Sequence, residues 1–411
     1  MTSPPTTTAL LWLCAGFLGS GFAGTTPADT KEMGSATTGV LVGECANGSD
    51  WDRALSVPTL YKNAKNPWVH EVAVCGQLQT QYAYGSDASG QFGSNDMPDE
   101  LTWGDIEVRR MRLGLKGRLI GNLTFLYLID LHPDLSPRIY KRTPETYFTW
   151  SEGNAFSISA GKSELKFNRE QEYSSKELLP FERTALGNMF YGGELLGTWV
   201  CGKGIAGGWL YHLGAYNNER VDEISHFNGG SMILGKIGYD YTQRTGFDLA
   251  EVKFQYLHNT DPGFADSVTN LASPSYSDCV SISNQITAGP FGLTTEFLWG
   301  DGVSGRSDVC GLMAMPTYFF TEKLQLITTF EFAGSREDNG VILPTRYEAL
   351  SAHVGDKAGD AYFAGFAGLN YYIHSHNLKL MSGVKYSYLD GGSHGGDFDG
   401  WTMLAGVRIA F

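Results

Sequence analysis

Four basic residues recur at alternate positions within one short stretch of the chain, EVRRMRLGLKGRL. They are Arg110, Arg112, Lys116 and Arg118. In a β-strand, residues two apart share a face and lie about 6.6 Å apart along the strand. A row of cations at this spacing lowers the energy of an entering anion, and guanidinium groups bind phosphate oxygens through paired hydrogen bonds. The spacing therefore indicates a surface that attracts anions.

The opposite face of the same stretch is apolar, which indicates how the strand must lie. Met111, Leu113 and Leu115 occupy the intervening positions. A basic side chain that faces lipid near the middle of a membrane costs about 2–4 kcal/mol. The four cations are therefore expected on the water-filled side of a barrel wall. Glu107 and Arg109 interrupt the apolar face, so we expect them near the membrane interface or in a loop.

Alternation of apolar and polar residues with period two continues along most of the chain. Val252, Phe254 and Tyr256, for example, alternate with Glu251 and Lys253, so such a strand has one apolar face and one polar face. Clusters rich in Gly, Asp, Asn and Ser separate these stretches and are typical of turns and loops. Similar alternation is found at 70–85, 209–213, 293–299, 323–332 and 378–388. The pattern predicts antiparallel β-structure throughout.

The composition favours a membrane barrel over a soluble β-sandwich. Of the 411 residues, 52 are glycine, 13% are aromatic and only 18% are charged. Transmembrane barrels have such a composition because lipid-facing and lumen-facing residues alternate. The length suits about 14 to 18 strands, with about 16 expected, and a barrel of this size leaves an aqueous channel. The net charge of -14 argues against nucleic acid as a partner.

The chain ends in an alternating strand whose last residue is aromatic. In WTMLAGVRIAF, the side chains at every second position from Trp401 to Phe411 are apolar. This ending resembles that of outer-membrane proteins recognised by the barrel assembly machinery, which implies that machinery as a partner through Phe411. Arg408 lies opposite the lipid face of the strand and is a further candidate for the lumen wall.

The N-terminal segment indicates export from the cytoplasm. Residues 9–24 form an apolar run that ends in small residues, with Gly21 and Ala23 placed as at a signal-peptidase site. We expect a signal peptide at 1–23, a periplasmic or lumen-entering extension at 24–68, and a barrel domain at 69–411. A buried N-terminal strand or helix is the alternative for the first segment.

Within the barrel domain, three stretches resemble phosphate-selective porins of the O and P type from the outer membrane of Gram-negative-type bacteria. The first is residues 107–131 and the third is the closing hairpin at 369–411. The second, residues 158–190, carries that family's Gly-Lys strand end, its Ser-Ser segment and its Glu-Arg pair, here Gly161-Lys162, Ser174-Ser175 and Glu182-Arg183. The resemblance implies a 16-stranded homotrimer in outer-membrane lipid, with basic residues lining a constricted lumen.

The resemblance also implies that the second stretch contains a loop that folds into the lumen. Its basic residues would then face the channel, and Lys162 and Arg183 are the strongest candidates of the set Lys162, Lys166, Arg169, Lys176 and Arg183. The alternative is that these are solvated charges of an external loop, paired with its acidic residues. Those are Glu164, Glu170, Glu172, Glu177 and Glu182.

No catalytic, metal or cofactor motif is evident, so we do not expect an enzyme. The glycine-rich GKGIAGG at 202–208 lacks the P-loop frame, and His374 and His376 have no third metal ligand nearby in the sequence. Glu251 and Glu296 could imitate the carboxylate pair of a glycosidase, but balanced charge in a pore explains them more simply. The cysteine spacing shows no metal motif and assigns no disulfide.

The sequence as a whole predicts an outer-membrane porin that lets small hydrophilic solutes diffuse passively, with a bias toward anions such as phosphate. The bias rests on the face that carries Arg110, Arg112, Lys116 and Arg118. Two alternatives stay open at this point. One is a structural barrel with a plugged lumen that anchors surface material, and the other is a secreted soluble β-domain or carbohydrate-active enzyme.

Overall fold

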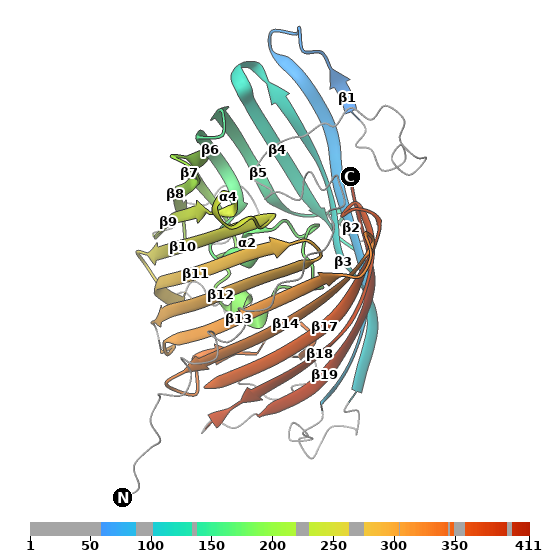
Figure 1. The fold of residues 1–411 in the computed structure, drawn as a ribbon, viewed down its shortest axis with the longest axis vertical. Coiled ribbons are helices and arrows are strands. Elements are labelled where there is room, and N and C mark those ends of the chain that lie inside the picture. The colour runs from blue at the N-terminus through green and yellow to red at the C-terminus, as the bar shows by residue number, and fades with distance from the viewer. Residues whose placement is uncertain are drawn as a thin grey trace, which may run out of the picture. The chain divides into compact units, whose positions relative to one another are not determined.

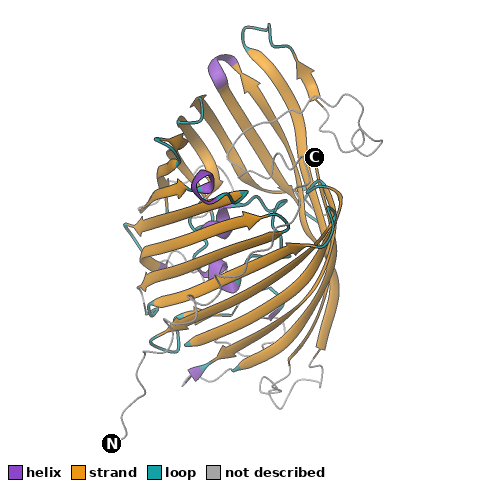
Figure 2. Cartoon of the chain, viewed as in Figure 1, coloured by secondary structure: helices purple, strands orange, loops and turns teal. Residues whose placement is uncertain are grey.

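The structure, a computed structural model, consists almost entirely of β-strands in the part that it describes (Figure 2). That part comprises residues 59–87, 102–133, 138–218, 230–262, 275–303, 305–343, 346–348, 358–392 and 397–411. All of these residues belong to one compact unit, residues 38–411. The signal peptide expected at 1–23 and most of the extension expected at 24–68 lie outside the described residues.

Sixteen long strands, each antiparallel to the next along the chain, form a closed wall because the last of them pairs with the first (Figure 1). The strands are β2 (Val69–Asp87), β3 (Thr102–Leu119), β4 (Leu123–Leu131), β5 (Tyr140–Glu152), β6 (Phe156–Glu164), β7 (Glu194–Ile205), β8 (Trp209–Asn217), β9 (Ser231–Asp240), β10 (Leu249–Asn259), β11 (Tyr276–Ala288), β12 (Phe291–Gly302), β13 (Val309–Phe319), β14 (Leu324–Ser335), β17 (Ala361–His374), β18 (Leu378–Asp390) and β19 (Phe398–Ala410). The prediction of an antiparallel barrel of about 16 strands is confirmed.

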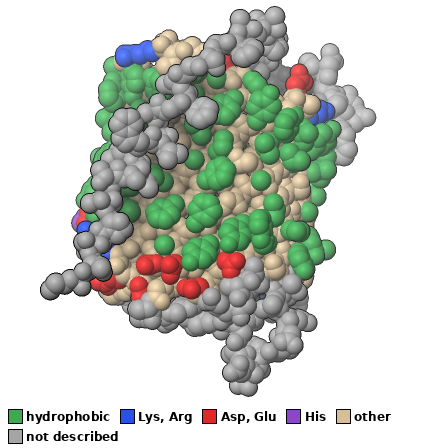
Figure 3. All heavy atoms as spheres, turned by 60° about the horizontal axis from the view of Figure 1, so that its bottom comes forward, with side chains coloured by type: hydrophobic (Ala, Val, Ile, Leu, Met, Phe, Trp, Pro, Cys, Tyr) green, Lys and Arg blue, Asp and Glu red, His purple; other side chains and the backbone are tan. Residues whose placement is uncertain are grey.

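The alternation in the sequence corresponds to the two faces of this wall. On β10, Val252, Phe254 and Tyr256 point outward, while Glu251 and Lys253, which alternate with them, are buried inside. Figure 3 shows the result as a broad band of apolar side chains on the outside, with carboxylates gathered along its lower edge. None of the helices in the described residues is long and apolar enough to cross a membrane.

The seam of the barrel lies at the two ends of the strand sequence. β19 pairs with the second half of β2, and backbone hydrogen bonds of 3.0 and 3.1 Å between Gly76 and Phe411 end that ladder. A further short strand, β1 (Thr59–Lys62), pairs with the beginning of β2 beyond this point. Part of the segment that precedes residue 69 therefore extends the sheet.

Connections at one end of the barrel are short turns, and the connection from β6 to β7 is much longer. We call residues 165–193 the lumen loop; it contains the short helices α2 (Arg169–Glu172) and α3 (Ala185–Met189). In Figures 1 and 2 both helices lie within the barrel. The remaining short elements are η1 (Ile120–Asn122), α4 (Thr242–Thr245), β15 (Val341–Ile342) and β16 (Ala358–Gly359).

The lumen loop is seated on the wall by apolar contacts at glycine positions. A Cβ at Gly300 of β12 would lie 2.6 Å from a ring carbon of Phe190, and one at Gly311 of β13 would lie 2.5 Å from Leu186. Phe190 also stacks on Tyr276, with ring centroids 5.0 Å apart. Because glycine has no side chain, these two wall positions leave room for the fully buried Leu186 and Phe190.

Candidate functional site

The basic strand β3 contains a β-bulge that determines which of its side chains enter the barrel. Gln79 on β2 is opposite Arg110, but the next residue, Thr80, is opposite Val108, so Arg109 is the extra residue. A bulge turns the residues beyond it to the other face. Arg109 and Glu107 therefore point inward, as does Arg110. The expectation that Glu107 and Arg109 lie at the interface or in a loop is wrong, because strict alternation takes no account of a bulge.

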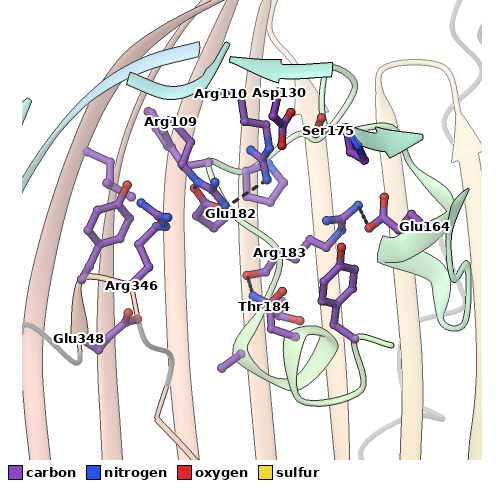
Figure 4. A pocket seen from close by; sticks show the side chains of 18 of the residues that line it. Arg109, Arg110, Asp130, Glu164, Ser175, Glu182, Arg183, Thr184, Arg346 and Glu348 are labelled. Atoms are coloured by element: carbon purple, nitrogen blue, oxygen red, sulfur yellow. Dashed lines mark hydrogen bonds and ion pairs between the residues drawn. The ribbon is translucent and has the colours of Figure 1, made fainter. Parts of the chain in front are cut away.

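Inside the barrel lies a cavity of about 470 Å³ between β3, the lumen loop and the wall strands beyond it (Figure 4). Its charged lining is nearly balanced, with eight basic and seven acidic side chains. These are Arg109, Arg110, Arg112, Lys141, Arg142, Arg183, Arg346 and Lys385, and Asp130, Glu145, Glu164, Glu182, Glu194, Glu331 and Glu348. Among the described residues, no group of three or more His, Cys, Asp or Glu side chains could hold a metal ion.

A chain of ion pairs runs along one side of this cavity. Asp130 accepts from Arg112 at 2.6 Å and from Arg142 at 2.7 Å, and Arg142 continues to Glu194 at 2.8 Å. Arg112 also lies 3.4 Å from the hydroxyl of Ser175 in the lumen loop. Each charge in this chain of ion pairs has a partner of opposite sign, so this side of the cavity carries little net charge.

Glu182 of the lumen loop faces the bulge in β3. Arg109 holds its carboxylate with two hydrogen bonds of 2.6 and 3.0 Å, and a nitrogen of Arg110 lies 3.9 Å away. Arg110 also donates to the amide oxygen of Gln79 at 2.8 Å. Burial alone would raise the pKa of Glu182, but Arg109 and Arg110 hold that pKa well below its usual range. The carboxylate therefore stays ionised.

A second segment enters the barrel from the connection between β14 and β17. Ile342, Leu343, Arg346, Tyr347 and Glu348 of this connection line the cavity. Arg346 is paired with Glu107, the Tyr347 hydroxyl contacts Glu107, and Glu348 is paired with Lys385 at 2.7 Å. Sequence reasoning missed this segment, because nothing in its composition distinguishes it from an external loop.

Arg408 and Lys379 hold the lumen loop against the wall. Arg408 donates to the backbone carbonyls of Leu178 at 2.9 Å and Pro180 at 3.2 Å, and Lys379 donates to that of Leu178 at 2.7 Å. Both side chains are almost fully buried. Arg408 faces the interior as the alternation implies, but the loop covers it, so it does not line the cavity.

The other predicted residues separate into two groups. Arg110, Arg112 and Arg183 line the cavity, whereas Lys116, Arg118 and Lys162 do not. The side chain of Arg118 is 45% exposed and pairs with Glu71 at 3.0 Å, while Lys162 is buried.

Arg183 shows the inward position that the resemblance implies, together with the pairing to an acidic residue that the alternative included, but it is not a solvated charge of an external loop. It lies in a loop that folds inward, and it pairs with Glu164 at 2.8 Å.

On its far side the lumen loop is fixed by ion pairs to β9 and β10. Glu172 contacts Lys236 at 2.9 Å and Lys253 at 2.7 Å, and Arg169 contacts Glu251 at 2.7 Å. Glu296 of β12 accepts the backbone N–H of Arg169 at 2.8 Å. Glu251 and Glu296 thus both hold the lumen loop through Arg169. The described cysteines, Cys75, Cys201, Cys279 and Cys310, are free.

Comparison with known proteins identifies the architecture. No protein-family model matches the sequence, and no curated protein matches it either. Solved structures do match: the outer membrane channel DcaP of Acinetobacter baumannii is 13% identical, with a TM-score of 0.52, over 85% of this chain and 99% of that one. OprB of Pseudomonas putida is 11% identical, with a TM-score of 0.56, over 82% and 94%.

The anion-selective porin from Comamonas acidovorans is 14% identical, with a TM-score of 0.54, over 83% of this chain and 99% of that one. At this level of identity the likeness concerns the fold. The chain therefore has the barrel fold of outer-membrane porins.

Proposed function

We propose that this protein is an outer-membrane porin that conducts small hydrophilic solutes by passive diffusion. The observation that carries the proposal is the charged cavity of about 470 Å³ inside a closed barrel. Charged side chains keep such a space wet, because an empty cavity would leave them without solvation. Passive diffusion of hydrophilic solutes requires such a hydrated space inside the barrel.

The channel favours anions such as phosphate, and the bias is modest. Arg110 supports the preference because its closest acceptor is the neutral amide of Gln79, while the nearest carboxylate oxygen is 3.9 Å away. The near balance of basic and acidic side chains limits the bias. The resemblance of the sequence to phosphate-selective porins and the anion-selective porin among the structural neighbours point in the same direction.

The same proposal includes location and assembly. The apolar outer band suits outer-membrane lipid, and the export signal expected at 1–23 and the terminal Phe411 suit delivery to the barrel assembly machinery. By resemblance to the phosphate-selective porins, the protein assembles as a homotrimer. No catalytic role is included, since the acidic pairs that could suggest one hold the lumen loop.

Electrical recording in a planar bilayer tests the function. Purified protein in a KCl gradient should give stable conductance steps and a reversal potential of anion-selective sign. A cation-selective sign would refute the bias. Absence of stable steps would instead favour a plugged structural barrel, for which the partly filled interior around Leu186 and Phe190 is the specific argument.

A further inference from the structure

Three guanidinium groups from two distant parts of the chain surround one carboxylate at the cavity wall. Arg109 and Arg110 come from the bulge in β3, and Arg346 comes from the segment between β14 and β17. Figure 4 shows their side chains around Glu182. The burial of Glu182 would raise its pKa, but these three guanidinium groups act together to lower it. The lumen loop thus places one acid among three bases.

The way Arg109 binds Glu182 is the way an arginine binds a free oxyanion. The two hydrogen bonds, 2.6 and 3.0 Å long, start from two different nitrogens of one guanidinium group and end on the two oxygens of the carboxylate. This two-pronged arrangement serves carboxylate and phosphate alike. The position of the Glu182 carboxylate is therefore one that a small oxyanion can occupy.

The cluster remains open to solvent, which an exchange of anions requires. Side-chain exposure is 20% for Arg109, 21% for Glu182 and 41% for Arg346, and Arg109, Glu182 and Arg346 all line the cavity. With Glu107, which pairs with Arg346, the cluster holds three positive and two negative charges. Neutralising Glu182 would raise the net charge of the cluster from +1 to +2.

We propose that Arg109, Arg110 and Arg346 form an oxyanion-binding site in the channel, and that Glu182 is a tethered anion that occupies it and competes with the solute. The inference rests on the proposed function and adds a specific site to it. A passing carboxylate or phosphate takes the hydrogen bonds of Arg109 as Glu182 gives them up. Because the competitor is part of the protein, the site binds weakly, and weak binding lets an ion leave again.

The variant Glu182→Gln tests the proposal, because the proposal predicts that this variant binds phosphate more tightly than the wild type. The amide keeps the shape and one acceptor oxygen but removes the charge. Inorganic phosphate added to a KCl bath should reduce the chloride current at an about fivefold lower concentration than in the wild type, the effect of one unit charge a few ångströms away in a solvated site. Acetate, tested in parallel, distinguishes a general oxyanion site, which it would also occupy, from a site that fits only phosphate.

Glu164→Gln is the matched control, since it also removes an inward carboxylate, but one whose ion pair among the described residues is with Arg183 alone. It should change the phosphate response less than Glu182→Gln does. Adding Arg346→Gln to Glu182→Gln should return most of the gain. Equal responses of Glu182→Gln and Glu164→Gln, in channels that conduct as the wild type does, would overturn the site while leaving the porin function intact. A wild type without conductance would overturn both.

Discussion

Two carboxylates of the lumen loop, twelve positions apart, have opposite surroundings. Glu170 is buried within the loop, where its oxygens accept the backbone N–H of Thr184 at 3.1 and 3.2 Å, and it has no ion pair of its own among the described residues. Glu182 lies at the cavity, held by Arg109. Burial raises the pKa of Glu170 to about 7, whereas the arginines hold the pKa of Glu182 well below its usual range despite its burial.

The comparison divides the interior of the barrel into two regions. On the covered side, the loop meets the wall through Leu186, Phe190 and Tyr276, and polar groups there serve to fix the backbone. On the open side, charged side chains pair across the cavity and remain partly exposed. The covered side should therefore govern stability, and the open side should govern which ions pass.

The largest expected effect follows from breaking the covered side. Phe190→Ala should lower the free energy of unfolding by about 4 kcal/mol, because it removes a fully buried ring and leaves a cavity between the loop and Gly300. Because the loop then loses this packing contact with the wall, single-channel steps should become noisy. Denaturant unfolding in detergent micelles measures the first effect, and bilayer recording the second.

Phe254→Ala is the control for this change. Phe254 sits on the outer face of β10 and is 45% exposed, so the same truncation leaves the loop untouched. Its conductance steps should remain as steady as those of the wild type. If both variants gave equally noisy steps, the packing of Phe190 against the wall would not be what keeps the conductance steady.

The outer wall was predictable from the sequence, and the interior was only partly so. Lipid imposes one rule on every strand, so alternation such as that of Val252, Phe254 and Tyr256 suffices to place a face. The interior has no such rule. The bulge at Arg109 moves two charges to the other face, and only the pairing with Gln79 and Thr80 reveals it.

The partners of the predicted cations were beyond sequence reasoning for a related reason. Asp130 lies near Arg112 because β3 and β4 are adjacent, which the alternation allows one to guess. Arg346 reaches Glu107 across 239 positions through a connection without a recognisable pattern. Arg408 was expected to face the channel, but whether a loop covers it depends on the fold of the whole interior.

A smaller effect should appear in the pH dependence of the covered side. A carboxyl group whose pKa is higher in the folded state than in the unfolded state binds more protons when folded, so the stability falls as the pH rises between the two values. For Glu170 these values are 4.5 and about 7. The loss should approach about 3 kcal/mol between pH 4 and pH 8. Glu170→Gln should lack this component, and unfolding of both proteins at the two pH values measures it.

Glu182→Gln provides the contrast that sharpens this test. Glu182 has a lowered pKa, so its contribution to stability is complete once the pH is well above the unfolded value of 4.5, and it should not change between about pH 6 and pH 8. The difference between wild type and Glu182→Gln in free energy of unfolding should therefore be nearly constant over this range. If this difference varied with pH for Glu182→Gln and stayed constant for Glu170→Gln, the assignment of Glu170 to the covered side and of Glu182 to the open side would be wrong.

The smallest effect should come from single charges on the open side. Arg110→Gln should leave the stability nearly unchanged and shift the reversal potential in a KCl gradient toward cations, by an amount equivalent to about 1 kcal/mol or less, because water screens a charge beside the cavity. Arg118→Gln removes the same charge from the same face of β3, but outside the cavity lining. If position relative to the cavity decides selectivity, Arg118→Gln should shift the potential less than Arg110→Gln. Equal shifts would mean that the ions sense the whole basic face of β3, as the sequence pattern alone suggests, and not the part that the loop leaves open.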